Sequence, residues 1–446
     1  MRVEAGDGQV VAHVGLHALG RFADRLDFGE RLSGQFAWTG ERAPFHDRGT
    51  VMVQAMLMLA GGGESVADIE HLRTQDRLFG PVPSDTTLRR TILAIDPATL
   101  SGLASAVAET RALVWARSDA TAGPVVLDLD ASIVEIHSEN KEGTAPHFKH
   151  GFGFHPMLCF ADQTGEMLAG LLRPGNAGAN NAADHLSVLD DSIGQLPVEI
   201  AIGHRPGDDP ALVARPVMVR TDSAGCTRAF INGCRERNIG FGVVARQNSN
   251  IHGAIGGLSV VDARWVRTER REGKHRHVAH VVEITDLVDL SDWPPRTRLI
   301  VRREKRHPGA QRSLFPSEEF RYWAHYTDQT DTPVALDAHM RAHAHVEDHI
   351  RRLKASGLER FPFAGLDANR AWLALVGMAA DLVRWFQLLC CTGALAKAEP
   401  KRMRWSFWHT PARVVRRAGT DTIRIIDGWP TTTDLIDAYR NIAALT

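Results

Sequence analysis

The chain has 446 residues, of which 44% are hydrophobic and 24% charged, and its formal net charge is −1. These values are ordinary for a globular protein of two or three domains, and the overall charge excludes a polybasic nucleic-acid-binding chain. Cationic residues gather locally, however. Residues 341–446 hold 16 Lys and Arg against 10 Asp and Glu, and residues 264–306 hold 12 against 7. Such excesses permit an anionic partner without requiring one.

The cysteines and the apolar segments exclude several further classes of protein. None of the five cysteines forms a C-x-x-C pair, so zinc-finger and redox motifs are absent. The N-terminus lacks an apolar signal core, and Asp381 and Arg384 interrupt the most apolar stretch, 371–386. We therefore expect a cytoplasmic protein with reduced cysteines and no membrane partner.

The first 118 residues read as a helical region. An apolar helix over 51–63 ends at three glycines, a shorter helix covers 64–73, and Ser84 is a suitable N-cap for a third. Short helices joined by tight turns are typical of a helix-turn-helix-like DNA-binding region. A plain helical bundle fits the same pattern.

Strands and helices alternate over residues 119–245, which predicts an α/β domain with a central mixed sheet. Four strand-like runs separated by polar turns then indicate a β-rich insertion over 246–335. Helical periodicity returns over 336–395, and residues 396–446 form a basic C-terminal region.

Two carboxylates interrupt the apolar strand VVLDLDASIVEIH at 125–137. Asp128 and Asp130 are two residues apart, so in a strand they share a face. Buried carboxylates are costly unless they are paired, hydrogen-bonded or bound to a cation. A positive partner is therefore expected beside this strand.

Asp222 and Glu347 are the carboxylates that complete a candidate metal site. Asp222 ends a later strand and precedes small residues that let a ligand approach, and sites in α/β sheets favour such strand ends. In the helix that carries Glu347, Arg351 and Lys354 follow at i+4 and i+7. Three carboxylates from separate elements suit a hard divalent cation, and two such ions can catalyse phosphodiester chemistry.

The chain resembles the DDE transposases of bacterial insertion sequences, in particular the insertion-sequence thirteen-eighty group of the insertion-sequence-four-like class. The resemblance covers nearly the whole length. It is carried by LMLAGGGESVADIEHLR, PSDTTLRRT, LDLDASIVEIHSENKEGTAPHFKHGFGFHPM, GEMLAGLLRPGNAGANNAADH, VRTDSAG, RREKRHPGAQRSLF, VEDHIRRLKASGLERFPF and AEPKRMRW. It implies an RNase H-like catalytic core that binds two Mg²⁺ ions, or Mn²⁺.

The resemblance also implies roles for individual residues. It makes Asp130, in the D-x-T-like Asp130-Ala131-Ser132, the first metal ligand and catalytic residue, with Asp222 in TDSAG the second and Glu347 in VEDH the third. The class carries a Y-x2-R-x3-E-x6-K signature, which Glu347 and Lys354 match. Met340 and His343 occupy its Tyr and Arg positions, and Arg341 or His343 could replace the Arg in phosphate contact.

Several assignments have alternatives. Asp128 could be an outer-shell residue or the partner of an arginine, Asp348 could replace Glu347, and His345 with His349 has a spacing that can bind zinc. Arg173 and the Gly/Asn-rich loop 173–181 could contact DNA, or form a turn whose asparagines cap a helix. The segment KRMRWSFWH mixes cations with Trp405 and Trp408, which suits DNA, although their spacing also suits a buried helix face.

The expected function is cut-and-paste transposition, in which the ends of an insertion sequence are nicked and the freed 3′-hydroxyl is joined to target DNA. Lys354, Arg351, Arg341 and Arg173 are the predicted phosphate contacts. The expected partners are double-stranded DNA, as terminal inverted repeats and target, and a second copy of the chain in a homodimeric synaptic complex. The alternatives are a Mg²⁺-dependent nuclease without joining activity and a catalytically inactive DNA-binding protein.

Overall fold

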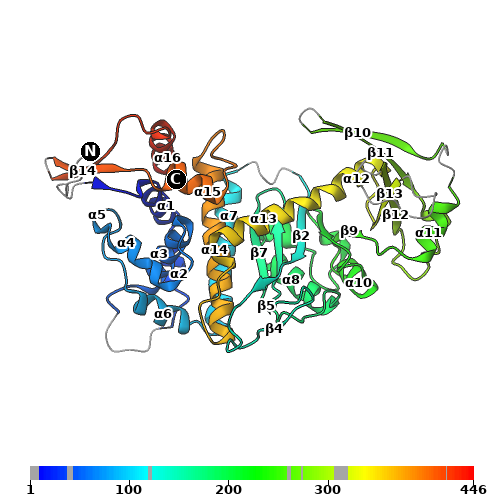
Figure 1. Ribbon diagram of the computed structural model, residues 1–446, viewed down its shortest axis with the longest axis horizontal. Coiled ribbons are helices and arrows are strands. Elements are labelled where there is room, and N and C mark those ends of the chain that lie inside the picture. Colours follow the sequence, from blue (N-terminus) through cyan, green and yellow to red (C-terminus); the bar gives the residue numbers. More distant parts are fainter. Residues whose placement is uncertain are drawn as a thin grey trace.

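The computed structural model describes residues 10–37, 44–118, 123–258, 263–272, 275–305, 320–417 and 419–445. It has an elongated shape in which a helical lobe, a central α/β layer and a strand-rich lobe follow one another along the long axis (Figure 1). The stretch HPGAQRSLF, which contributes to the family resemblance, lies outside the described residues.

The helical lobe is built from both ends of the chain. Strand β1 pairs with β14, and helix α1 packs against α16, so residues beyond 411 close onto the first helices (Figure 1). The predicted C-terminal region is thus part of this lobe. Its elements are β1 (Val10–Val11), α1 (Val14–Arg25), α2 (Phe28–Ser33), α3 (Arg48–Gly61), η1 (Val66–Ile69), α4 (Glu70–Arg73), α5 (Asp76–Phe79), α6 (Asp85–Leu93), α7 (Pro97–Ala116), β14 (Ala412–Arg417), β15 (Thr420–Ile425) and α16 (Thr432–Ala444).

The predicted helix boundaries in this lobe are confirmed where the capping chemistry is local. Helix α3 ends at Gly62, which adopts φ 107°, a conformation that glycine tolerates. Ser84 caps α6 by accepting a hydrogen bond from the Thr87 backbone N–H. The β14–β15 hairpin was not predicted, because its strands carry arginines and threonines in place of an apolar pattern.

One nine-stranded sheet runs through the centre and into the strand-rich lobe, in the order β10-β11-β12-β13-β9-β8-β2-β6-β7. Strands β2, β8 and β9 are parallel, β6 is antiparallel to β2, and β7 is antiparallel to β6, so the predicted mixed sheet is confirmed. The insertion continues this sheet through antiparallel pairing of β13 with β9, both labelled in Figure 1. The strands are β2 (Val125–Ala131), β6 (Met157–Ala161), β7 (Glu166–Leu171), β8 (Val217–Thr221), β9 (Gly240–Val244), β10 (Val266–Glu272), β11 (His275–Glu283), β12 (Arg298–Lys305) and β13 (Phe320–Thr327).

The remaining elements cover the sheet or link it to the helical lobe. A small sheet of β3 (Val134–Glu135), β4 (Ala145–Pro146) and β5 (Phe152–Phe154) extends from the end of β2. The helices are α8 (Ala182–Gly194), α9 (Val198–Ala201), η3 (Pro210–Leu212), α10 (Arg228–Glu236), α11 (Ser249–Gly256), η4 (Thr285–Leu287), α12 (Pro333–Arg341), η5 (Ala342–Ala344), α13 (His345–Leu353), η6 (Lys354–Leu358), α14 (Leu366–Cys390), α15 (Pro400–Met403) and η7 (Arg404–Trp408).

Helix α14 joins the two halves, because it packs on α3 of the helical lobe and on β7 of the sheet. By length and composition alone, α14 could cross a membrane. Two pairs of consecutive helices would also pass this test if each bent pair were one span. In this structure the apolar surface of α14 is accounted for by burial between the lobes. Its buried Asp381 accepts a 2.6 Å hydrogen bond from Arg111, which also bonds Glu166 at 2.9 Å.

Candidate active site

The site lies at the carboxyl ends of the parallel strands β2 and β8. Their register places Asp128 opposite Arg220 and Leu129 opposite Thr221. Asp130 and Asp222 are the next residues along each strand in the same direction. Strand register therefore brings together two carboxylates that are 92 positions apart in the sequence.

Glu347 reaches this strand end from α13, which crosses the sheet (Figure 1). Burial raises the pKa of Asp130 to about 6, and the negative charges of Asp222 and Glu347 add to this effect. Asp222 and Glu347 are thus each close enough to Asp130 to repel its negative charge. Asp348, the alternative third ligand, instead pairs with Arg351 and Arg352.

The charge balance differs between Asp128 and the three other carboxylates. Both Asp128 oxygens accept hydrogen bonds from Arg220, at 2.8 and 2.6 Å, and His343 Nδ1 lies 2.8 Å from Oδ1. Burial alone would raise the pKa of Asp128, but these hydrogen bonds and the charge of Arg220 hold it below its ordinary value. The alternative that Asp128 partners an arginine is confirmed. A metal between Asp128 and Asp130 is not needed to explain why Asp128 is buried.

Asp130, Asp222 and Glu347 have no cationic side chain as an ion-pair partner within the described part of the chain. Asp130 and Asp222 each accept one backbone hydrogen bond, from Ala131 at 2.7 Å and Ala224 at 2.8 Å. Oxygen ligands of this kind, carrying uncompensated negative charge, fit a hard divalent cation such as Mg²⁺. Among the described residues, no group of three or more His, Cys, Asp or Glu side chains is arranged so that it could hold a metal ion without movement. Asp222 and Glu347 are exposed, so their carboxylates can move.

Arg220 also ties α12, the helix that leads into α13, to the sheet. Besides Asp128, it donates a 2.7 Å hydrogen bond to the His339 carbonyl and contacts Asp162 at 2.8 Å. His343 bonds Asp128, and His345 Nδ1 lies 2.8 Å from Asp162. The segment immediately before Glu347 is therefore held to strand β2, to strand β8 and to the turn at Asp162. Sequence reasoning missed Arg220, although it precedes Asp222 by two residues as Asp128 precedes Asp130.

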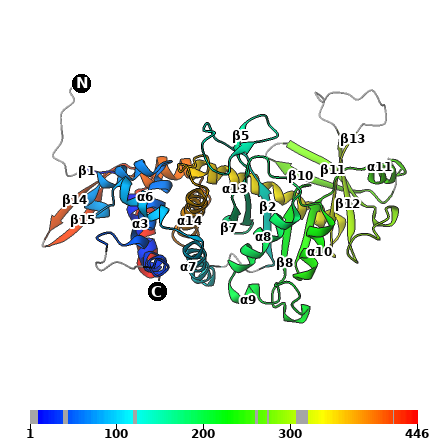
Figure 2. The same ribbon diagram turned by 90° about the horizontal axis from the view of Figure 1, so that it is seen from below.

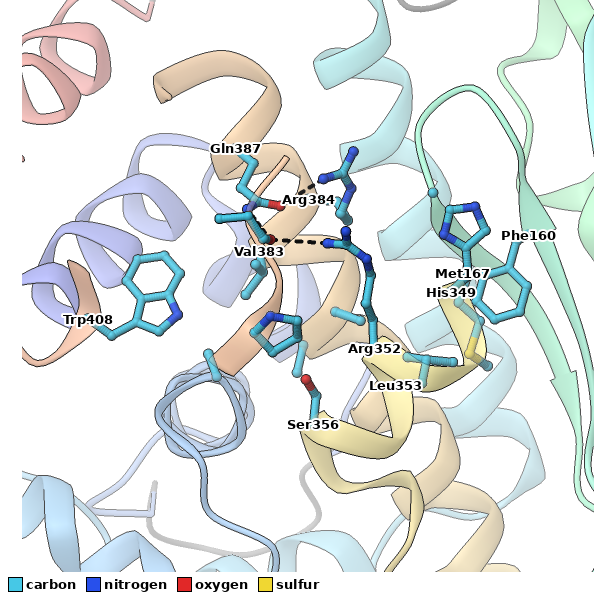
Figure 3. A pocket seen from close by; sticks show the side chains of 16 residues that line it. Phe160, Met167, His349, Arg352, Leu353, Ser356, Val383, Arg384, Gln387 and Trp408 are labelled. Atoms are coloured by element: carbon cyan, nitrogen blue, oxygen red, sulfur yellow. Dashed lines mark hydrogen bonds between the residues drawn. The ribbon is translucent and has the colours of Figure 1, made fainter. Parts of the chain in front are cut away.

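A pocket lies between the buried side of α13 and helix α14 (Figure 3). Arg352 bonds the Ala398 carbonyl at 3.1 Å, and Arg384 bonds the Thr164 carbonyl at 2.8 Å. His349 packs on Phe160, with ring centroids 5.4 Å apart. Because His345 bonds Asp162 and His349 packs inward, the alternative zinc pair is not assembled.

The predicted phosphate contacts differ in how close they lie to the site and in whether they already have a partner. Lys354 lies beside the site, since its Nζ donates a 3.2 Å hydrogen bond to the Ile133 carbonyl just beyond the Asp130-Ala131-Ser132 motif. Arg351 is bound in bidentate fashion by Glu399, with both distances 2.8 Å. Burial raises the pKa of Asp337, and the positive charge of Arg341, which ends α12, opposes this effect. The DNA contacts of these residues stay predictions.

Arg173 has a structural role in place of the predicted DNA contact. Its side chain is 4% exposed and bonds the carbonyls of His155 and Gly178 and the Asp184 carboxylate. Asn181 caps α8, so the alternative interpretation of this loop, a turn with a capping asparagine, is confirmed.

The small residues after Asp222 also have an internal explanation. A Cβ at Gly225 would lie 2.2 Å from Thr221 Oγ1, so the turn itself requires glycine. A ligand's approach is not needed to explain it.

Comparison with known proteins agrees with this geometry. A family model described as "Transposase DDE domain group 1" matches residues 1–446. The chain therefore belongs to the DDE transposases, and the family expected from the sequence is confirmed. Comparison with curated protein sequences gives no match.

A solved structure similar to the chain is the piggyBac transposase in a synaptic complex with hairpin DNA, determined by cryo-EM. The similarity covers 84% of this chain and 74% of that chain, with a TM-score of 0.41 and 10% sequence identity. This likeness is too distant to assign residues.

Proposed function

We propose that this protein is a cut-and-paste transposase of a bacterial insertion sequence, of the insertion-sequence thirteen-eighty group in the insertion-sequence-four-like class. It nicks the terminal inverted repeats of its element and joins the freed 3′-hydroxyl to target DNA. The observation that carries the proposal is that Asp130 and Asp222 lie side by side at the ends of two neighbouring strands, with Glu347 close to Asp130. Within the described part of the chain, none of these three carboxylates has a cationic side-chain partner. Membership of the DDE transposase family supports the same function.

Asp130, Asp222 and Glu347 are the residues that would hold two Mg²⁺ or Mn²⁺ ions. When bound, such ions activate the attacking oxygen and stabilise the leaving oxygen of a phosphodiester. The chain's own part is to position these carboxylates, through Arg220 and the hydrogen bonds that hold α13. Lys354, fixed by the Ile133 carbonyl, places a positive charge beside the strand end where a phosphate oxygen would lie.

The remaining parts of the proposal concern organisation and partners. The order β7-β6-β2-β8-β9, three antiparallel strands followed by two parallel ones, supports an RNase H-like core. The helical lobe would supply a DNA-binding region, and two copies of the chain would hold two transposon ends. The working location would be the bacterial cytoplasm, on the nucleoid.

The test is a cleavage assay on DNA carrying the ends of the element that encodes this chain. The parent, Asp222→Ala and Glu359→Gln are compared with Mg²⁺ and with EDTA. Glu359 is exposed and lines the same surface pocket as Glu347 and Lys354, so it is a matched acidic control. Expected are metal-dependent nicks at the ends, followed by joined products, in the parent and the Glu359 variant but not in Asp222→Ala. Nicking without joining would indicate a nuclease, and specific binding without nicking an inactive DNA-binding protein.

A further inference from the structure

Trp405 is an exposed aromatic residue in a position that the catalytic geometry does not explain. Its side chain is 84% exposed, whereas Trp408, three residues later in the same turn, is 1% exposed and packs in the core. Single exposed apolar residues are common on protein surfaces, so Trp405 becomes informative through the charged groups around it. The segment KRMRWSFWH therefore divides its two tryptophans between the core and the surface.

The surface around Trp405 is continuous with the end of α13. Arg404 donates hydrogen bonds to the carbonyl of Ala355, which follows Lys354, and to that of Ala60 at the end of α3. Glu399, just before α15, is bound by Arg351 of α13. These contacts place Trp405 between the catalytic helix and the helical lobe.

The charges on this surface favour a polyanion. Lys401 and Arg402 are exposed, and within the described part of the chain neither forms an ion pair. Two of the neighbouring acids are already neutralised, because Glu399 and Asp348 pair with Arg351 and Arg352. Lys401 precedes Trp405 by four residues, which places both on one side of the helical turn. We call Lys354, Lys401, Arg402 and Trp405 the basic-aromatic surface.

We propose that the basic-aromatic surface holds an unpaired stretch of the DNA strand next to the cleavage site, with Trp405 stacked on a base and Lys401 and Arg402 on phosphates. This inference rests on the proposed function. Cations beside an exposed aromatic ring are the combination that single-stranded nucleic acid requires. In an intact duplex the base faces are covered by their neighbours, so a planar indole needs an unpaired base.

The test measures binding in EDTA, where no cleavage occurs. Fluorescence anisotropy compares a blunt element end with the same end carrying a five-nucleotide single-stranded extension. The proteins are the parent, Trp405→Ala, Trp405→Phe, Lys401→Ala/Arg402→Ala and Val198→Ala. Val198 is an exposed apolar residue, 80% accessible, on α9, which lies apart from α15 (Figure 2).

Trp405→Ala is expected to weaken binding of the extended DNA about tenfold and of the blunt DNA less than threefold. Trp405→Phe should keep most of the affinity, because a phenyl ring still stacks, and Val198→Ala should bind like the parent. The Lys401/Arg402 double variant should lower the slope of log K against log salt by about 1.5 to 2. Equal affinities of Trp405→Ala and the parent for both DNAs, or an equal loss on both, would overturn the stacking assignment.

Further readouts separate this inference from the proposed function. If the parent binds DNA through Trp405 but never nicks it, the inference stands and the transposase proposal fails. If the parent nicks and Trp405→Ala nicks and binds equally well, only the inference fails. If Trp405→Ala instead abolishes self-association without DNA, measured by sedimentation, the surface joins two copies of the chain and the inference is wrong. Thermal unfolding checks that each variant is folded.

Discussion

Asp128 and Arg220 face each other in register across β2 and β8, and two hydrogen bonds of 2.8 and 2.6 Å join them. Two residues further along each strand, Asp130 and Asp222 form the next row of the same sheet face. The first row is neutral and buried, whereas the second carries two negative charges at the strand ends. The neutral row anchors α13, and the anionic row provides the ligands for a metal.

Arg220→Met should destabilise the protein by about 3–5 kcal/mol, because it leaves the fully buried Asp128 carboxylate without its countercharge. Urea unfolding at pH 7 measures the loss. Replacing both partners, as Asp128→Leu with Arg220→Met, should recover much of it, since the uncompensated charge is then gone. A loss below about 1 kcal/mol for Arg220→Met would show that the pair does not hold the sheet and α13 together.

Asp130→Asn should stabilise the metal-free protein at neutral pH. The pKa of Asp130 is about 6 in the folded protein and 3.8 ordinarily, so the folded state binds the proton more tightly. The parent therefore loses stability as the pH rises from about 4 to 6, whereas the variant does not. The gain should reach up to about 3 kcal/mol above pH 6 and vanish below about pH 4, at 1.36 kcal/mol per pKa unit. Denaturant unfolding in EDTA across this pH range measures it.

Mg²⁺ provides the control for this result, since it should stabilise the parent and leave Asp130→Asn nearly unchanged. If the variant and the parent have the same pH dependence, burial and the neighbouring carboxylates do not raise the pKa of Asp130 as this structure indicates.

Lys354→Ala should slow nicking of bound DNA about 10- to 100-fold, because it removes a positive charge from beside the scissile phosphate. Its effect on unfolding should be small, since the side chain makes one hydrogen bond to a carbonyl. Arg360→Ala is the control, because Arg360 is an exposed cation shortly after η6 whose charge is paired with Glu64. Single-turnover kinetics with saturating enzyme separates rate from binding. A weaker affinity with an unchanged rate would remove Lys354 from the catalytic machinery.

Arg173→Ala should lower stability by about 2–3 kcal/mol, because it breaks three hydrogen bonds of a buried side chain and leaves Asp184 without its partner. DNA affinity, measured at a temperature where the variant is folded, should stay within about twofold of the parent. A large affinity loss in a stable variant would restore the DNA contact predicted from the sequence.

The sequence predicted those features that depend on local chemistry. Short apolar runs identified β2, β6, β7 and β8, and glycine and serine marked the end of α3 and the start of α6. The position of Asp222 at a strand end followed from the same pattern. The proximity of Glu347 came from the family resemblance, because no local rule connects α13 with β2.

Features that depend on register or on long-range packing could not be predicted in this way. Arg220 in an apolar strand was a signal of a buried ion pair, but choosing Asp128 as its partner requires the parallel register of β2 and β8. Likewise, the pairing of β1 with β14 joins segments separated by about 400 residues. The exposed fractions of Trp405 and Trp408 were undecided because η7 is a π-type turn, in which residues three apart need not share a face.

Metal preference at Asp222 tests the central claim most directly, because only a metal ligand changes it. A cysteine thiolate is a softer ligand than a carboxylate and binds Mn²⁺ far better than Mg²⁺. The nicking rate of Asp222→Cys on element-end DNA is therefore divided by the rate of the parent with the same ion. This ratio should be at least tenfold greater with Mn²⁺ than with Mg²⁺. Glu359→Cys should show no such preference. If the ratio of Mn²⁺ to Mg²⁺ activity is the same in Asp222→Cys as in the parent, Asp222 is not a metal ligand and the proposed site is wrong.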